Sequence, residues 1–185
     1  YLMKEFARAF GIAEEEAFCV GTGTNQPTGI FTANGGTVGV TAAANNAITA
    51  DELISLVYAL KSPYRRNAKF LMNDATVSII RKLKDKNDAY LWQPSLQAGE
   101  PDRLLGYELY TSPYVPTVAA GALTVAFGDF KNYWIGDRAG RTVQRLNELY
   151  ATNGQIGYVA TERVEGKVIL PEGIQLLKMK ATSGS

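Results

Sequence analysis

Apolar residues recur at steps of three and four along the first part of the chain, with most charged residues between them. This spacing predicts an amphipathic helix over residues 1–18. The stripe consists of Leu2, Phe6, Phe10, Ala13 and Ala17. Residues 21–49 are instead rich in Gly, Thr, Asn and Ala, which predicts a loop with a short hairpin over residues 36–41.

Two further helices are predicted, near residues 50–61 and 74–84. Thr49 begins the first with a capping box, because Glu52 lies three residues later, and Ser62–Pro63 is expected to end it. Asn73 or Asp74 is expected to cap the second. Its inner face would carry Val77, Ile80 and Leu83, and its last turns would carry Arg81, Lys82, Lys84 and Lys86. Basic residues at the end of a helix interact favourably with its dipole. They could also form a nucleic-acid-binding patch, but Asp85 and Asp88 interrupt the run of positive charge.

The remaining apolar segments are short and rich in residues that favour strands. One predicted strand, residues 69–72, lies between the two helices. The others follow at 104–110, 123–127, 133–135, 142–146, 155–163, 168–170 and 174–179. Because helices come first and strands later, the order predicts an α+β fold.

Composition excludes several kinds of chemistry. The chain has no histidine, so serine and cysteine triads that need an imidazole base cannot form. It has one cysteine, Cys19, which lies among apolar residues and is expected to be a buried, unreactive thiol. The net charge of +1 does not provide the basic excess of a dedicated nucleic-acid binder. No apolar run is long enough to span a bilayer.

Three local patterns could indicate a site, and each has a plainer interpretation. The segment GTGTNQPTGI, residues 21–30, has two closely spaced glycines, but a helix precedes it and Gln26 stands where a dinucleotide fingerprint needs a third glycine. We interpret it as a glycine-built helix exit. Carboxylate pairs could form acid–base sites, although surface positions are the simpler expectation. These pairs are Asp129 with Asp137 and Glu162 with Glu165.

An aromatic set could form a carbohydrate-binding platform, and is equally typical of a core or a subunit interface. Its members are Tyr90, Trp92, Tyr107, Tyr110, Tyr114, Tyr133 and Trp134. No metal-ligand set or phosphate loop is complete. We therefore expect no catalytic, cofactor-binding or metal-binding residues and no cofactor.

A series of phrases along the chain resembles the major capsid proteins of tailed bacteriophages, which have the Hong Kong-phage capsid fold. After GTGTNQPTGI come KFLMNDATVSIIRKLKD at 69–85 and YLWQPSLQAGEPDRLLGYELY at 90–110. VAFGDFKNYWIGDRAG at 125–140 and the segment 141–180 complete the series in the family's order. The resemblance covers nearly the whole chain and depends on the combination of these phrases.

The resemblance implies a structural, non-enzymatic subunit of an icosahedral phage or prophage capsid, which self-assembles into pentamers and hexamers around the genome. Residues 1–20 would be the spine helix of the peripheral domain and residues 21–150 mostly the axial domain. Residues 151–180 would be strands returning to the peripheral domain, and 181–185 a tail. The segment from Asp85 to Arg103 would project near the capsomer axis.

Other partners and the location also follow from the resemblance. Further copies of the chain would be the main partner, with scaffold, maturation protease and portal proteins as others. No membrane and no sequence-specific nucleic acid is implied. Assembly would take place in the cytoplasm of the bacterial host, and the product would be the virion capsid.

The family's N-terminal arm and extended loop precede the spine helix, so the resemblance implies a fragment that lacks both. We expect this chain to be folded and to run as a monomer or small oligomer.

Some residues depart from the family's pattern. Glu108 and Gly173 stand where proline and alanine are usual. Some relatives crosslink a lysine to an asparagine with the help of a glutamate. Asn153 lies near that asparagine position and Thr161 or Glu162 near the glutamate, and we carry over no crosslinking chemistry. Two alternatives stay open, namely an encapsulin-type nanocompartment shell and, from another class, a ligand- or carbohydrate-binding domain or carboxylate hydrolase.

Overall fold

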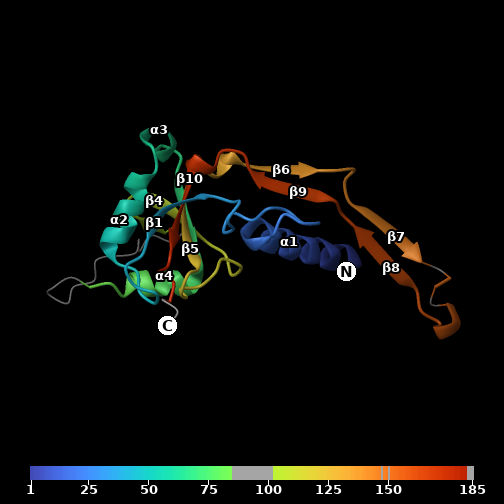
Figure 1. The fold of residues 1–185 in the computed structure, drawn as a ribbon. Coiled ribbons are helices and arrows are strands. Elements are labelled where there is room, and N and C mark those ends of the chain that lie inside the picture. The colour runs from blue at the N-terminus through green and yellow to red at the C-terminus, as the bar shows by residue number, and fades with distance from the viewer. Residues whose placement is uncertain (85–101, 147, 150, 183–185) are drawn as a thin grey trace.

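The computed structural model describes residues 1–84, 102–146, 148–149 and 151–182. It has a six-stranded sheet with helices packed on it, and a long arm of paired strands that extends away from the sheet (Figure 1). The mixed α+β class predicted from the sequence is confirmed. The projecting loop expected from Asp85 to Arg103 lies outside the described residues, except for its last two positions.

The first helix, α1, covers Leu2–Val20, so it runs slightly beyond the predicted end. It stops at Gly21, whose backbone is extended at φ −58° and ψ 143° and whose N–H donates to the carbonyl oxygen of Ala17. A Cβ atom at Gly21 would lie 2.2 Å from the carbonyl oxygen of Pro27. Only glycine therefore fits where the chain folds back against the helix, which confirms the interpretation of residues 21–30 as a glycine-built exit.

The second helix, α2 (Ala50–Ala59), begins with the predicted capping box. The Thr49 amide donates to the Glu52 carboxylate at 2.8 Å, and the Glu52 amide donates to the Thr49 hydroxyl at 3.3 Å. The expectation that Ser62–Pro63 ends this helix is wrong. Leu60 already has an extended backbone, and Ser62–Pro63 begins a short helix, α3 (Ser62–Arg65). Proline is favoured in a first helical turn because its missing N–H is not needed there.

The fourth helix, α4 (Asp74–Arg81), is capped by Asn73, whose side chain accepts from the Ala75 amide. Val77 and Ile80 are buried on its inner face, as predicted. The helix ends three residues before the predicted boundary of residue 84. Lys82 and Lys84 therefore lie beyond its last turn, and only Arg81 is placed there to interact with the helix dipole.

The sheet has the strand order β1-β10-β5-β2-β4-β3. Its strands are β1 (Thr37–Thr41), β10 (Ile174–Lys178), β5 (Leu123–Gly128), β2 (Lys69–Met72), β4 (Tyr107–Thr111) and β3 (Arg103–Leu104). The pairs β1–β10 and β2–β4 are parallel, and the other neighbours are antiparallel. The hairpin predicted over residues 36–41 is wrong, because this segment is a single edge strand whose partner is β10 near the other end of the chain.

The single strand predicted over residues 104–110 is instead the hairpin β3–β4. Leu105 and Gly106 form its turn, with φ values of +53° and +85°. Two consecutive residues with positive φ are typical of the tight turns that join antiparallel strands.

The core lies on both faces of the sheet, since neighbouring residues of its central strands point to opposite sides. Val125 and Phe127 of β5 pack with the buried faces of α2 and α4. Between them, Ala126 faces a second cluster that includes Cys19 and Val168. The rings of Phe70 and Phe127 lie 4.5 Å apart between centroids. The sheet is therefore covered by α2 and α4 on one face and by the end of α1 with its following loop on the other.

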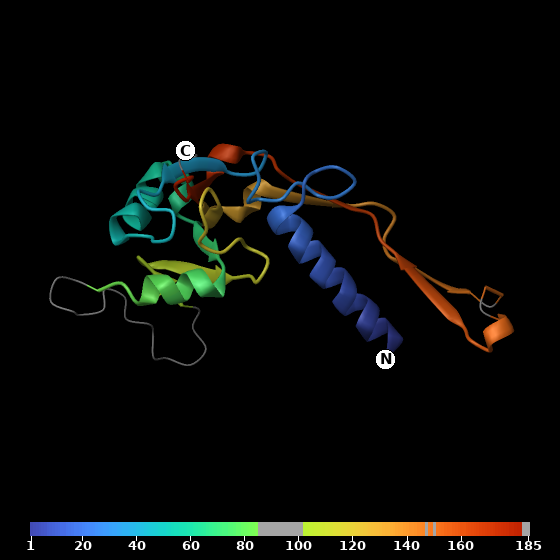
Figure 2. The same cartoon turned by 60° about the horizontal axis from the view of Figure 1, so that its bottom comes forward.

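The arm consists of two consecutive antiparallel strand pairs. The inner pair is β6 (Tyr133–Asp137) with β9 (Val164–Val168), and the outer pair is β7 (Thr142–Leu146) with β8 (Gly157–Thr161). Strands predicted at 155–163 and 168–170 need correction, since β8 covers only Gly157–Thr161 and β9 covers Val164–Val168. The arm runs past α1 and ends well away from the sheet (Figure 2).

Candidate assembly surfaces

The outer strand pair, β7–β8, exposes apolar side chains on both of its faces. Because directly opposed residues share a face, Val143 and Tyr158 lie on one side and Val159 on the other. These side chains are between 40% and 43% exposed. At the end of the pair, Leu149 and Ile156 are exposed to 66% and 49%. The outer arm therefore presents a two-sided apolar surface that no other part of the described chain covers.

The inner strand pair is attached to α1 by aromatic packing. The Tyr133 ring meets the Phe18 ring edge-on at 5.6 Å between centroids. The Tyr133 hydroxyl donates to the Thr28 carbonyl oxygen at 3.0 Å. Burial raises the pKa of Tyr133 above its usual 10.0, and the nearby Glu165 carboxylate adds to the shift. A Cβ atom at Gly166 would lie 2.3 Å from the Tyr133 hydroxyl, so glycine leaves room for this ring.

An arginine joins the arm to α1 further out. The Arg141 Nε atom lies 2.6 Å from Glu162 of the arm, and its Nη2 atom lies 2.9 Å from Glu14 of α1. The guanidinium carbon is 5.7 Å from the centroid of the Phe10 ring. Hydrogen bonds to Glu162 and then to Glu14 raise the pKa of Arg141. We call Glu14, Arg141 and Glu162 the arm clamp.

A groove of about 790 Å³ lies between α1 and the arm beside this clamp. Its apolar lining comes from Phe10, Ala13, Ala17, Pro27 and Val164, and its charged lining includes Glu14, Arg138, Glu162, Arg163 and Glu165. The mixture of both charges with small apolar residues does not resemble a site built for one small ligand, where a few polar groups converge in an apolar pocket.

The end of α1 contacts the sheet region through a polar chain that runs from the exposed Glu15 to the buried Cys19. Ser112 donates to the Glu15 carboxylate at 2.7 Å, and its oxygen lies 3.8 Å from the Cys19 sulfur. Burial raises the pKa of the Cys19 thiol from its ordinary value. A buried thiol with a raised pKa is a poor nucleophile, so the structure agrees with the prediction of an unreactive Cys19.

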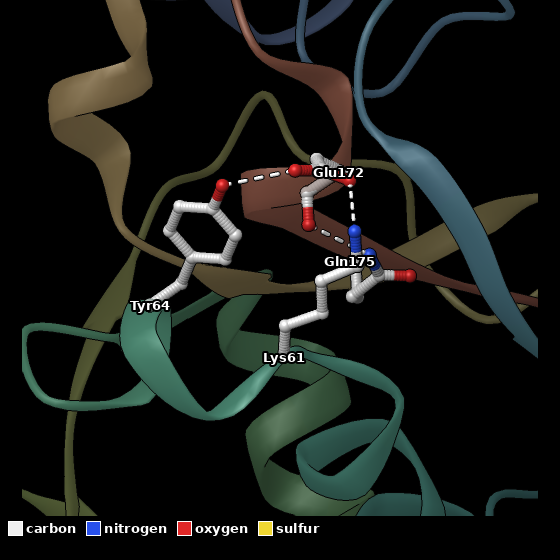
Figure 3. A network of polar contacts seen from close by, with 4 residues as sticks. All are labelled: Lys61, Tyr64, Glu172 and Gln175. Atoms are coloured by element: carbon white, nitrogen blue, oxygen red, sulfur yellow. Dashed lines mark hydrogen bonds and ion pairs between the residues drawn. The ribbon is translucent and has the colours of Figure 1, made fainter.

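A second polar network ties α3 to the short 3-10 helix η3 (Pro171–Gly173), which leads into β10 (Figure 3). The Glu172 carboxylate accepts from Tyr64 at 2.9 Å and forms an ion pair with Lys61. The Gln175 side chain donates to the Glu172 carbonyl oxygen at 3.0 Å. The bond from Lys61, followed by that from Tyr64, lowers the pKa of the Glu172 carboxyl. The network lies at the surface, so we assign it a role in orienting α3.

The carboxylate pairs considered from the sequence do not form an acid–base site. Asp129 accepts from the Lys131 amide at the start of a short 3-10 helix, η1 (Phe130–Asn132), while Asp137 ends β6 beyond it. Glu162 and Glu165 do line the same groove, but Glu162 is bound by Arg141. Asn153 and Glu162 lie beyond opposite ends of β8, and the Thr161 hydroxyl is within 2.7 Å of that of Thr142.

The glycine-rich segment 21–30 uses its amides within the chain. The Gly23 amide donates to the Pro27 carbonyl, Thr28 to Gly166, and Gly29 to Gly21, at 3.2, 2.7 and 2.8 Å. These amides are therefore not available to hold a phosphate. Among the described residues no group of three or more acidic, histidine or cysteine side chains could hold a metal ion.

The aromatic set is divided between the core and the surface. Tyr107 packs on Phe70 and Phe127 in the core, whereas Trp134 is 66% exposed on the arm and Tyr110 is 47% exposed on the sheet. Tyr90 and Trp92 lie outside the described residues. The described members of the set thus do not form one platform. No helix in the described part of the chain has the length and apolar character to cross a membrane.

A model of the phage capsid family matches residues 1–179. The chain belongs to the phage capsid family. This confirms the resemblance seen in the sequence, and membership in a family of structural proteins confirms the expectation that the chain is not an enzyme. A comparison with curated proteins gives no match.

Solved capsid structures agree with this assignment. Capsid chains of native and of empty GTA particles are each 38% identical to this chain, with a TM-score of 0.85. The match covers 97% of this chain and 65% of the GTA chain, so this chain spans about two thirds of the length of that relative.

More distant structures share the fold alone. A Gordonia phage Cozz chain gives a TM-score of 0.68 at 14% identity, with 96% of this chain and 62% of that chain covered. The holo-SrpI encapsulin complex from Synechococcus elongatus PCC 7942 gives 0.63 at 16% identity, with 100% and 68% covered.

Proposed function

We propose that this phage capsid family chain is a structural subunit of an icosahedral phage, prophage or GTA-type capsid. In this proposal, copies self-assemble into pentamers and hexamers in the bacterial cytoplasm and enclose the genome in the finished particle. The 38% identity to the capsid chain of a GTA particle supports a capsid over an encapsulin-type shell, for which the identity is 16%. The divided aromatic set and the clamped Glu162 give no support to a carbohydrate-binding domain or a hydrolase.

The observation that carries the proposal is the apolar surface of the outer arm. An isolated two-stranded hairpin is marginally stable in water, and β7–β8 has no third strand in the described part of the chain. Its exposed valine, tyrosine, leucine and isoleucine side chains would gain stability if a partner covered them. A subunit of a closed shell always has neighbouring copies, so we assign a second copy of the chain as that partner.

The domain assignment follows the same logic. We place α1 and the arm in the peripheral domain and the six-stranded sheet with α2, α3 and α4 in the axial domain. Strands β6 and β7 lie within the segment 21–150 that the sequence assigned mostly to the axial domain. We group them with the returning strands because β6 pairs with β9 and β7 pairs with β8. Contacts with scaffold, maturation protease and portal proteins stay part of the proposal.

The test is electron microscopy of the parent protein, expressed from its whole gene, with matched arm variants. Val143→Ser and Val159→Ser each replace one exposed apolar side chain, one on each face of the outer arm. The double variant should form fewer shells, and its subunit should stay folded. Ile54→Ser, which changes an exposed residue of α2, should assemble as the parent does. Shells that form equally well from the double variant would refute the arm's role. A folded parent that never forms particles would refute the proposed function itself.

A further inference from the structure

We propose that Asn153–Gly154, in the connection between β7 and β8, is a site of spontaneous deamidation. The chain contains two Asn-Gly dipeptides, Asn34–Gly35 and Asn153–Gly154. This dipeptide favours deamidation because glycine places no Cβ atom beside the backbone nitrogen that must attack. The fold treats the two dipeptides very differently, and that difference makes Asn153 the reactive one.

The reaction needs only water. The backbone nitrogen of Gly154 attacks the Asn153 Cγ atom, a new N–Cγ bond forms, and the Cγ–Nδ2 bond breaks. Ammonia leaves with the proton released from the Gly154 amide, and a cyclic imide remains. Water then opens the imide at the Cγ carbonyl to give aspartate, or at the backbone carbonyl to give isoaspartate. No oxidation or reduction takes place.

The backbone around Asn153 lies at the surface, with open space beside Gly154. Asn153 ends a short 3-10 helix, η2 (Ala151–Asn153), and residues 152–156 are all exposed. A Cβ atom built on Gly154 would meet nothing within 4 Å, and Gly154 has a φ of +65° that glycine adopts without strain. The connection also joins a two-stranded pair of marginal stability, where local opening has a low free energy.

The backbone at Asn34 is held by packing and hydrogen bonds. Asn34 is exposed as well, so side-chain exposure does not separate the two sites. Gly35, however, is buried, and a Cβ atom there would lie 2.1 Å from the Ile30 carbonyl oxygen. Its amide donates to the Thr32 carbonyl at 3.1 Å, and the Gly36 amide donates to Ile30 at 3.1 Å. The nitrogen of Gly35 can therefore attack only after this loop opens.

The product changes the end of the arm. Either product adds one negative charge at residue 153, and isoaspartate also adds a methylene to the main chain within the connection. Both changes fall beside the exposed apolar residue Ile156. The inference concerns the folded chain alone and does not rest on the proposed function.

Peptide mass spectrometry of the folded chain, aged at mildly alkaline pH in ¹⁸O-labelled water, tests the proposal. Asn153 should convert at least about tenfold faster than Asn34, which corresponds to an opening cost about 1.4 kcal/mol higher at the Asn34 loop. In urea-unfolded protein the two sites should convert at similar rates, which isolates the effect of the fold. Asn153→Gln should remove the fast conversion and leave the slow one. Equal rates in the folded chain, or a faster Asn34, would overturn the proposal.

Discussion

The Arg141 Nη2 atom lies 2.9 Å from the Glu14 Oε1 atom, which joins the arm to α1 across residues far apart in the sequence. The second bond of the same guanidinium goes to Glu162, whose side chain is only 6% exposed. Removal of Arg141 would leave this shielded carboxylate without its cation. Since Arg141 itself is half exposed, we expect its removal to weaken the attachment of the arm without unfolding the sheet.

Arg141→Gln should therefore loosen the arm and leave the sheet intact. Amide hydrogen exchange in β7 and β8 should become faster, by roughly a few-fold, while exchange in β5 and β10 should not change. Arg145→Gln is the matched control, because Arg145 is an exposed arginine on the same arm. If the two variants behave alike, the clamp does not hold the arm.

Gly166 is expected to tolerate no side chain, whereas Gly136 on the paired strand β6 should tolerate one. In Gly166→Ala the new Cβ atom would displace the Tyr133 hydroxyl from its bond to Thr28 and press on the Phe18 ring. Overpacking of this kind costs about 1–3 kcal/mol of unfolding free energy. Gly136→Ala, in β6 with open space at its Cβ position, should change stability by less than about 1 kcal/mol.

Urea unfolding of both alanine variants, monitored by circular dichroism, measures this difference. A Gly166→Ala protein as stable as Gly136→Ala would mean that Tyr133 moves aside at no cost.

The elements that the sequence predicted well are those whose signals are local. The capping box of Thr49 and Glu52 lies within one turn, and the strand Lys69–Met72 lies between clear boundaries. The segment of the edge strand β1 was predicted as a local hairpin, because it is short, contains glycine and lies in a stretch rich in Gly, Thr, Asn and Ala. It becomes a strand through parallel pairing with β10, a contact with no local signal.

The arm clamp shows the same limit for surfaces. In the sequence, Glu14 is one of several charges on the polar face of a helix. Arg141 is likewise one of several arginines near predicted turns. Only the three-dimensional course of β6 to β9 brings them together with Glu162. The resemblance to capsid proteins was found because it depends on the order of phrases along the chain. The residues that fix the arm depend instead on long-range geometry.

Alkaline pH should destabilise the protein partly through Tyr133. Its folded pKa is raised above the ordinary 10.0, so above that pH the unfolded state loses a proton that the folded state keeps. Stability from this group is therefore fully present below pH 10.0 and falls as the pH rises beyond it. Tyr133→Phe should be less stable at neutral pH, since it loses the bond to Thr28, but its stability should decline less steeply above pH 10.0.

Urea midpoints on both sides of the tyrosine pKa check this prediction. Tyr158→Phe, at an exposed tyrosine of β8, serves as the control and should follow the parent protein. A Tyr133→Phe protein that declines as steeply as the parent would show that another group controls the alkaline loss.

Acid should weaken the network around Glu172. Lys61 and then Tyr64 hold the pKa of this carboxyl below its ordinary 4.5, so its contribution to stability is present above pH 4.5. That contribution is lost as the pH falls through the lower, folded value. Glu172→Gln should therefore slightly lower the urea midpoint at neutral pH and flatten its decline in acid. Because Lys61 and Glu172 are substantially exposed, added salt should reduce the difference in urea midpoint at neutral pH.

The control is Glu16→Gln, at an exposed glutamate of α1, which should change neither the neutral-pH urea midpoint nor its decline in acid. A Glu172→Gln protein with the acid sensitivity of the parent would mean that Glu172 does not stabilise the packing of α3 on the sheet.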